Sequence, residues 1–392
     1  TQTFGAKNFY HARTVPVIAN REVRASNEHG STRHIEIDIS DADHVKYTTA
    51  DNLSVCPRAP AELVEQLADR MGYDLDRVFS LVPPPSARPD EAKALFPVPC
   101  TVEQALSMYL NIVSVPKRNI LKHFAYYAEN ESEREALLHL AADGHTEMRK
   151  SWVSIVDVLM EHQSVDVPLE AFVQMVPTTK PREYTISSSS LANPKTIHIT
   201  VSVAENGLCS NYLDRVDVFP ETDLRSSRVD VFVHPSTFRL PRDTETPIIM
   251  VGPGTGIAPM RAFLQERSFQ KSEGVSIGKS VLYFGCRNRN NDDIYADELQ
   301  QHLDDGVLTR LEVAYSREQE EKVYVQHLLK RDAAELWDLL EEGAYFYVCG
   351  ATSMGNDVMS TMEEVVQSEG GRSAEDAQKY IKSMQAQHRY IQ

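Results

Sequence analysis

The sequence has few cysteines, and they form no pattern. The five are dispersed, odd in number and without a pair at metal-ligand spacing: Cys56, Cys100, Cys209, Cys286 and Cys349. A disulfide framework would need an even, closely spaced set, so this distribution favours free thiols in a reducing, intracellular setting. We therefore predict no metal site.

Long hydrophobic runs and excess positive charge are also missing. No apolar run is long enough to span a bilayer, and the N-terminus does not resemble a signal peptide. The chain carries 57 acidic and 40 basic residues, a formal net charge of −17. This balance argues against nucleic acid or an anionic membrane surface as a partner and permits a basic one. We expect a cytoplasmic protein without direct membrane contact through this segment.

The 392 residues are enough for two or three domains. Strand-like alternation occupies residues 34–55, helical spacing dominates residues 61–162, and strand-like alternation returns over residues 182–234. From residue 247 onward, short apolar strands alternate with helices, which is typical of a doubly wound parallel sheet. We predict a β domain from residues 1–57 and 165–241, a helical insertion at 58–164, and an α/β domain at 242–392.

A glycine-rich loop lies between a predicted strand and a predicted helix at residues 248–259. An apolar run ends in three alternating glycines, with Thr255 between the last two and Pro259 near the expected helix start. Glycines let the backbone approach a pyrophosphate, and free N–H groups at a helix start attract it. The loop is thus a candidate dinucleotide site at the carboxyl edge of the sheet, or else an ordinary strand–helix turn.

A basic cluster follows another predicted strand. Ser316 can donate a hydrogen bond, Arg317 can grip phosphate oxygens, Lys322 adds a charge, and Tyr324 offers a ring for adenine to stack on. This chemistry suits a ribose 2′-phosphate and hence NADP rather than NAD. A solvated helix start is the alternative, because acidic residues lie between the bases.

Three further segments carry candidate site residues. In the first, Arg182 could neutralise a pyrophosphate, Tyr184 could lie against an aromatic ring system, and Thr185 could hydrogen-bond a ring nitrogen. In the second, Gly207 opens a probable helix and offers a phosphate site. In the third, Cys349 ends a strand and could pack beside a nicotinamide ring. Each segment has an ordinary alternative. The first could be a polar strand end, the second a common helix entry, and the third a cysteine packed in the core.

Together these segments resemble, in content and order, the FAD/NADPH module of the diflavin reductases. The similarity runs nearly end to end and is nearest to the cytochrome P-450 reductase branch. Sulfite reductase and nitric oxide synthase types are alternatives, as is a binding module without turnover. The motifs that carry the resemblance are 20–22, 47–57, 96–101, 182–190, 238–241, 248–259, 283–287 and 322–326. Simple ferredoxin–NADP reductases lack the helical insertion.

The resemblance implies an antiparallel β-barrel FAD domain, a helical connecting domain, and a ferredoxin–NADP reductase-like NADPH domain. It implies catalytic roles for Thr185 and Cys349. The implied FAD-binding residues are Arg182, Glu183, Tyr184, Thr185, Thr200, Val201, Ser202, Gly207, Leu208, Cys209 and Ser210. The implied NADP-binding residues are Arg21, Gly254, Thr255, Gly256, Cys286, Arg287, Ser316, Arg317, Lys322, Tyr324, Gln326, Met354 and Asp357.

The resemblance also implies a place in an electron-transfer chain. NADPH would give a hydride to FAD, and electrons would then pass to FMN in an upstream domain that this sequence does not contain. A haemoprotein such as cytochrome P-450 would be the final acceptor. The full-length protein would be anchored to the cytoplasmic face of the endoplasmic reticulum by an N-terminal segment.

Some positions depart from the family pattern. Asn206 stands where a tyrosine usually stacks on the FAD adenine, so we expect weaker FAD binding or a different adenine position. An arginine expected after Trp152 is absent, and Arg149 is the candidate substitute. The sequence ends at Gln392, where family chains continue with an aspartate and a terminal aromatic, so we expect a truncated end.

Overall fold

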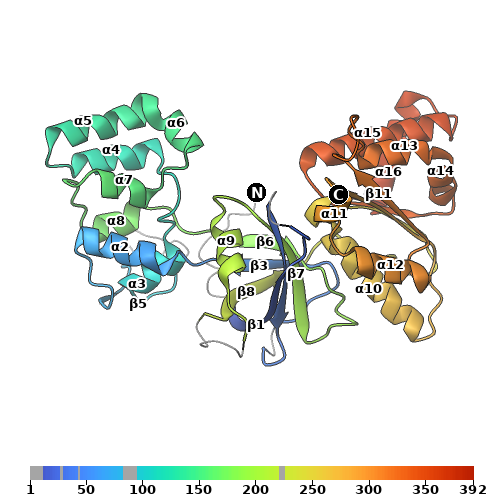
Figure 1. Ribbon diagram of the computed structural model, residues 1–392, viewed down its shortest axis with the longest axis horizontal. Coiled ribbons are helices and arrows are strands. Elements are labelled where there is room, and N and C mark those ends of the chain that lie inside the picture. The colour runs from blue at the N-terminus through green and yellow to red at the C-terminus, as the bar shows by residue number, and fades with distance from the viewer. Residues whose placement is uncertain (1–11, 27–29, 43–44, 83–94, 220–225) are drawn as a thin grey trace.

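The computed structural model describes residues 12–26, 30–42, 45–82, 95–219 and 226–392. Three regions lie in a row: a helical region, a central β-barrel and a C-terminal α/β region (Figure 1). The chain enters the barrel first, passes through the helical region, returns to the barrel, and ends in the α/β region.

The central region is an antiparallel sheet that closes on itself. Within the described residues its order is β6-β3-β8-β1-β2-β7. The strands are β1 Arg13–Glu22, β2 Ser31–Asp38, β3 Asn52–Cys56, β6 Arg182–Thr185, β7 Thr196–Val203 and β8 Arg228–His234. Just after β6, Ile186 bridges to Ile199 of β7, so the two edge strands meet. Alternating residues such as Ile35, Ile37 and Val201 fill the interior because strand side chains alternate between faces.

The helical region has its own hydrophobic core, which includes Phe96, Phe124 and Phe172. Its elements are α2 Ala61–Met71, β4 Val78–Phe79, β5 Cys100–Thr101, α3 Val102–Gln104, η1 Ala105–Tyr109, α4 Arg118–Tyr126, α5 Glu131–His139, η2 Leu140–Gly144, α6 His145–Lys150, α7 Ile155–Glu161 and α8 Leu169–Met175. Helix α8 packs in this core although it falls inside the segment predicted for the barrel. We propose that the boundary lies after Val176, since that residue still belongs to the helical core.

The C-terminal region is a parallel sheet with helices on both faces, in the order β11-β10-β9-β12-β13. Its strands are β9 Ile248–Val251, β10 Ser280–Cys286, β11 Arg310–Tyr315, β12 Tyr345–Val348 and β13 Tyr390–Ile391. Its helices are η3 Gly254–Gly256, α10 Ile257–Ser272, α11 Arg289–Asp292, α12 Ala296–Asp304, α13 Val325–Arg331, α14 Ala333–Glu341, α15 Thr352–Ser368 and α16 Ala374–Ala386. The predicted fold class, an antiparallel FAD-type domain with a helical insertion followed by a parallel-sheet domain, is confirmed. Helix α9, Leu208–Arg215, follows β7 on the barrel.

A buried polar seam joins the barrel to the α/β region. The Tyr295 hydroxyl lies 2.9 Å from Nδ1 of His34 and 2.8 Å from Oγ1 of Thr200. Arg261 donates to the Ser187 carbonyl at 2.8 Å and pairs with Glu298 at 2.9 Å. These contacts fix the two regions against each other and so set the space between them.

No helix in the described ranges is both long and apolar enough to cross a bilayer.

Candidate functional site

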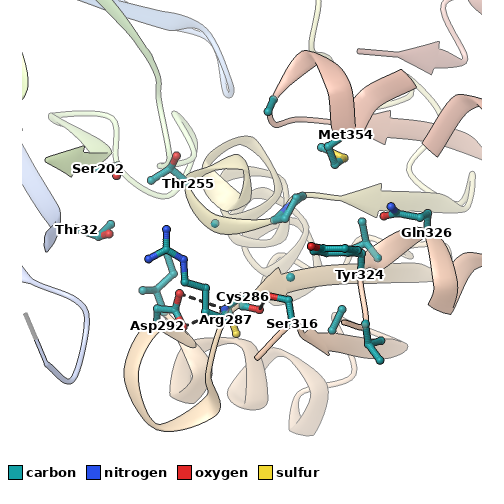
Figure 2. Close-up of a pocket in the computed structure, with 18 of the residues that line it drawn as sticks. Thr32, Ser202, Thr255, Cys286, Arg287, Asp292, Ser316, Tyr324, Gln326 and Met354 are labelled. Atoms are coloured by element: carbon teal, nitrogen blue, oxygen red, sulfur yellow. Dashed lines mark hydrogen bonds between the residues drawn. The ribbon is translucent and has the colours of Figure 1, made fainter. Parts of the chain in front are cut away.

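The first candidate site is a cavity of about 620 Å³ at the carboxyl end of the parallel sheet. Parallel α/β sheets bind ligands at this edge because the loops after adjacent strands diverge there. Figure 2 shows Thr32 and Ser202 from the barrel on one side and Tyr324, Gln326 and Met354 on the other. The cavity therefore lies between the two regions as well as at the sheet edge.

The glycine loop after β9 is packed too tightly for larger residues. A Cβ on Gly256 would overlap the Cys349 carbonyl oxygen and lie 2.8 Å from its carbon. A Cβ on Gly252 would lie 2.9 Å from the Gly256 carbonyl carbon. Gly254 has φ of 57°, a backbone conformation that glycine adopts at little cost. These glycines let the loop after β9 lie directly against the end of β12.

Two helix starts border this cavity without side-chain caps. One is the η3–α10 start after Pro253, and the other is the α15 start after Ala351. Uncapped N–H groups and the positive end of the helix dipole both favour a bound anion. The buried Oε1 atom of Gln326 has no hydrogen-bond partner among the described residues, so it is available to a ligand donor. The N–H donors fit the phosphates of a dinucleotide, and the Oε1 acceptor fits one of its hydroxyls.

Asp292 organises the loop that carries Arg287. Its carboxylate accepts hydrogen bonds from the backbone N–H of Arg287 at 3.1 Å and of Asn288 at 2.7 Å. The Asp292 carboxylate therefore holds the backbone of this loop in place. The Arg287 side chain extends from a fixed position in the cavity wall (Figure 2).

Most, but not all, of the predicted NADP residues line this cavity. The lining includes Gly254, Thr255, Cys286, Arg287, Ser316, Tyr324, Gln326, Met354 and Asp357. Arg21, Gly256, Arg317 and Lys322 are outside it, and all but Gly256 are exposed. Arg317 and Lys322 adjoin lining residues in the chain, and their roles stay predictions. Arg24 and Thr32 also line the cavity, although the sequence did not point to them. The one available signal was that Arg24 is a second basic residue close to the predicted Arg21.

The second candidate site is a cavity of about 750 Å³ between the barrel and the helical region. The barrel side carries the predicted flavin residues Arg182, Tyr184, Ser202, Gly207, Leu208, Cys209 and Ser210. Helix α9 starts here at Gly207 without a side-chain cap, which leaves N–H groups for an anion. A Cβ on Gly207 would overlap Ser210 Oγ and lie 3.0 Å from Ala204 Cβ, so a larger residue here would have to displace the Ser210 side chain.

The other predicted flavin residues lie outside this lining. Thr200 bonds to Tyr295, Val201 points into the barrel core, and Thr185 donates to Asn52 at 3.3 Å. Glu183 is exposed. Val201 is buried because it alternates with Thr200 and Ser202 along β7, so its side chain points to the opposite face of the strand. The flavin-binding roles of these side chains stay predictions.

The helical region contributes residues that sequence reasoning did not assign. Trp152 lines the second cavity, is 47% exposed and has φ of 55°. A non-glycine residue with positive φ is uncommon and marks a constrained position. Asn111 also lines this cavity, and its buried Oδ1 has no partner in the described part of the chain. Arg149, the suggested substitute for a missing arginine, is in the same wall.

The two cavities meet at Ser202, which lines both. Strand β7, which carries Ser202, also contacts η3 of the glycine loop. The two predicted catalytic residues, Thr185 and Cys349, are outside the lining of both cavities. Cys349 is half-buried at the end of β12, where burial raises the pKa of its thiol to about 11. Its thiol is therefore neutral near pH 7.

Comparison with known families shows what the two halves of the chain are similar to. Residues 5–211, more than half of the chain, match the family described as FAD binding domain. The chain belongs to the FAD binding domain family. Residues 250–360 of this FAD binding domain protein match a second family, the oxidoreductase NAD-binding domain. These two matches confirm the predicted binding of FAD and of a nicotinamide dinucleotide.

The similarity to individual FAD binding domain proteins extends over almost the whole chain. This chain is 39% identical to the NADPH–cytochrome P450 reductase of Drosophila melanogaster, and the alignment covers 99% of this chain and 58% of that protein. The reductases of Cavia porcellus and Homo sapiens are each 38% identical, again over 99% of this chain, and are covered to 59% and 58%. The chain thus spans about three fifths of the length of the curated relatives it matches. The predicted resemblance to a reductase FAD/NADPH module is confirmed.

Proposed function

We propose that this chain transfers a hydride from NADPH to FAD and passes the electrons on to a further carrier. The observation that carries the proposal is the meeting of the two cavities at Ser202. When bound, NADPH supplies the hydride and FAD accepts it. The protein's part is to hold the two rings at reacting distance and to exclude water from between them.

On the flavin side, the chain offers an anion site and ring surfaces. Arg182 and the uncapped start of α9 would hold the pyrophosphate. Tyr184, whose hydroxyl contacts Cys209, would lie against the flavin ring, with Thr185 near its reactive nitrogen. We propose that the exposed indole of Trp152 takes the adenine, in place of the tyrosine that Asn206 replaces.

On the nucleotide side, Thr255 and the N–H groups of the glycine loop would bind the pyrophosphate. Ser316 donates to the Cys286 carbonyl at 3.2 Å, which fixes its hydroxyl at the end of β11. Arg317 and Lys322 are free to close over a 2′-phosphate because both are exposed. Cys349, as a neutral thiol, would position the nicotinamide without placing a charge beside it.

An absorption spectrum tests the proposal directly. The purified or FAD-reconstituted protein should be yellow, and anaerobic NADPH should bleach its visible bands, because the flavin takes up the hydride. Ferricyanide, which accepts electrons from many flavins, should then be reduced rapidly. Cytochrome c should be reduced slowly by this chain, because neither of its two matched families is an FMN-binding domain. A colourless protein that FAD cannot reconstitute would contradict the proposal.

The basic cluster after β11 yields a specificity prediction. Changing Arg317 to alanine should remove one charge-assisted contact to the 2′-phosphate, about 1.5–3 kcal/mol. The KM for NADPH should therefore rise roughly 10- to 150-fold, since each 1.4 kcal/mol is a factor of ten. NADH kinetics should barely change, because NADH has no 2′-phosphate. Steady-state ferricyanide reduction with both nucleotides measures this, and equal losses would refute the role of Arg317.

The wider setting is also a proposal. An FMN-binding domain in the same protein would receive the electrons, and a haemoprotein such as a cytochrome P450 would be the acceptor. Reductases of that name are what the chain is similar to. We propose a cytoplasmic location, with the whole protein tethered to the endoplasmic reticulum. Joining the chain to an FMN domain and assaying cytochrome P450, sulfite reductase and nitric oxide synthase haem domains would identify the acceptor.

A further inference from the structure

Two histidines and a glutamate converge outside both cofactor cavities. His34 and Glu36 are two residues apart on β2, and His198 lies on β7. In the register of these strands Glu36 is directly opposite His198, and His34 is opposite Thr200. Residues at i and i+2 share one face of a strand, so the three side chains project from the same outer face of the barrel. Ile35 and Ile37 alternate with them and point inward.

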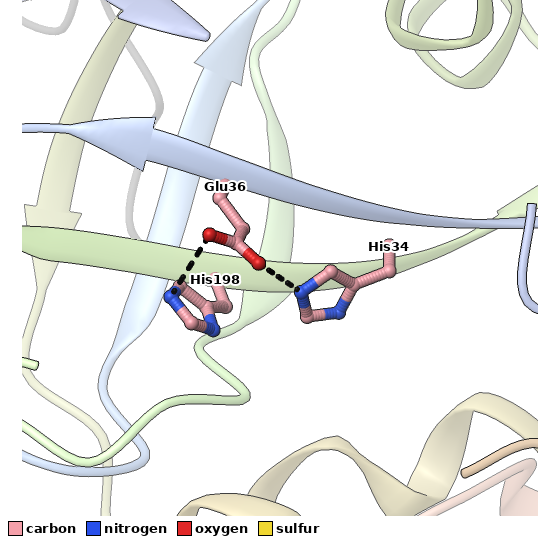
Figure 3. Close-up of side chains that lie close together, drawn as sticks. All are labelled: His34, Glu36 and His198. Atoms are coloured by element: carbon pink, nitrogen blue, oxygen red, sulfur yellow. Dashed lines mark hydrogen bonds and ion pairs between the residues drawn. The ribbon is translucent and has the colours of Figure 1, made fainter. Parts of the chain in front are cut away.

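The ligand-type atoms lie close enough to share one ion. His34 Nε2 is 3.1 Å from one Glu36 oxygen, and His198 Nε2 is 3.7 Å from the other. One atom from each of the three residues falls within 4.8 Å of the others. Figure 3 shows the carboxylate between the two rings. Both imidazoles are buried, at 0% and 7% exposure, and Glu36 is partly open to solvent, which provides an entry path.

The surroundings favour a metal ligand role for these rings. His34 Nδ1 bonds to the Tyr295 hydroxyl, which fixes the ring orientation and leaves Nε2, now in contact with Glu36, as the atom that would bind an ion. His198 makes its polar contacts through Nε2, and its buried Nδ1 has no partner among the described residues. Two cations lie near these rings: Arg261, which is paired with Glu298, and Arg21, which is exposed to solvent. Two imidazoles and one carboxylate form a ligand set that suits zinc, with a fourth position open to water.

We propose that His34, Glu36 and His198 bind a divalent transition-metal ion, with zinc the natural probe, at the seam between the barrel and the α/β region. The ion would cross-link β2 to β7, the strand that carries Ser202. It would also involve the α/β region through the bond from His34 to Tyr295. The proposal does not depend on the hydride-transfer function, because none of the three ligands lines a cofactor cavity.

Zinc competition with a chromophoric chelator tests the site on the flavin-containing protein. The wild-type chain should bind one zinc ion, and its melting temperature should rise with zinc concentration, since a ligand of the folded state stabilises it. Glu36→Gln and His198→Gln should each weaken zinc binding at least tenfold. Tyr295→Phe should weaken it roughly 10- to 100-fold through the lost orienting bond. Glu36→Gln keeps the shape and a hydrogen-bonding oxygen, so we expect the fold to be retained.

His162→Gln is the matched control, because His162 is a buried histidine in the helical region. It should leave zinc affinity unchanged. Cobalt substitution adds a second readout, since nitrogen and oxygen ligands give no thiolate charge-transfer band. Equal zinc affinity in the wild type, Glu36→Gln and His198→Gln would overturn the proposal. So would binding that disappears on alkylation of the thiols.

Discussion

Replacing Gly256 with alanine is expected to weaken NADP⁺ binding at least tenfold, about 1.4 kcal/mol, while the flavin stays bound. The added Cβ would overlap the Cys349 carbonyl oxygen and lie 3.4 Å from the Gly350 nitrogen. These are backbone atoms, so no side-chain rotation relieves the overlap. The loop after β9 and the loop after β12 would have to separate, which we expect to cost about 1–3 kcal/mol of stability.

Titration calorimetry with NADP⁺ measures the affinity, and the visible absorbance measures flavin content. Gly274→Ala is the control. Gly274 has φ of 82°, and a Cβ there would meet no atom of the described residues within 4 Å. That variant should lose only the backbone cost of about 1–2 kcal/mol in stability and keep its NADP⁺ affinity. Unchanged NADP⁺ binding in Gly256→Ala would show that the two loops need not touch.

Replacing Arg267 with methionine is expected to lower the free energy of unfolding by about 3–5 kcal/mol. Arg267 lies on α10 and is 1% exposed. Its guanidinium donates to the carbonyls of Gly278 at 2.7 Å and Thr246 at 2.6 Å, and to Ser280 Oγ at 2.9 Å. Methionine fills similar space but leaves these buried acceptors unpaired, at about 1–3 kcal/mol each before partial relief by water.

Urea unfolding followed by circular dichroism measures this loss. Lys279→Met is the control, because the Lys279–Glu342 pair, at 2.9 Å, is about half exposed on both sides. An exposed pair contributes about 0–1 kcal/mol, so the control should unfold almost as the wild type does. Burial lowers the pKa of Arg267 to about 10, so the side chain is still charged at neutral pH. A loss below 1 kcal/mol would mean that water replaces the guanidinium.

Much of the secondary structure could be predicted from the local pattern of apolar and polar residues. Strand β1 and the helices α13 and α14 are exceptions. Strands β9 and β12 of the α/β region are continuous apolar runs, as is typical of buried parallel strands, whereas the edge strand β11 includes Arg310 and Glu312. Strand β1, Arg13–Glu22, was not predicted; Pro16 interrupts its pattern, and its ladder is irregular between Val17 and Ala19. The spacing of apolar residues over 324–340 is that of one continuous helix, but the structure has two helices there, α13 and α14. They part at Asp332, whose carboxylate accepts from Arg331 and Tyr283 rather than facing solvent.

The residues of the two candidate sites also fall into two groups, those that local sequence patterns predict and those that they do not. The glycine loop, the start of α9 and the strand-end cysteines are local features, so motif and resemblance located them. Trp152 and Asn111 come from the helical region, and Arg24 and Thr32 come from the barrel side of the nucleotide cavity. Their place in the walls depends on how regions distant in sequence pack together, which no local pattern encodes.

The order of β, helical and α/β regions and the positions of the two glycine turns follow from the sequence, because alternation and glycine spacing act over a few residues. Tertiary structure alone decided that the cavities meet at Ser202 and that His34, Glu36 and His198 share one face. Barrel closure and the register of β2 against β7 set these positions. The register depends on pairings between residues more than 150 apart in the chain, such as Glu36 with His198.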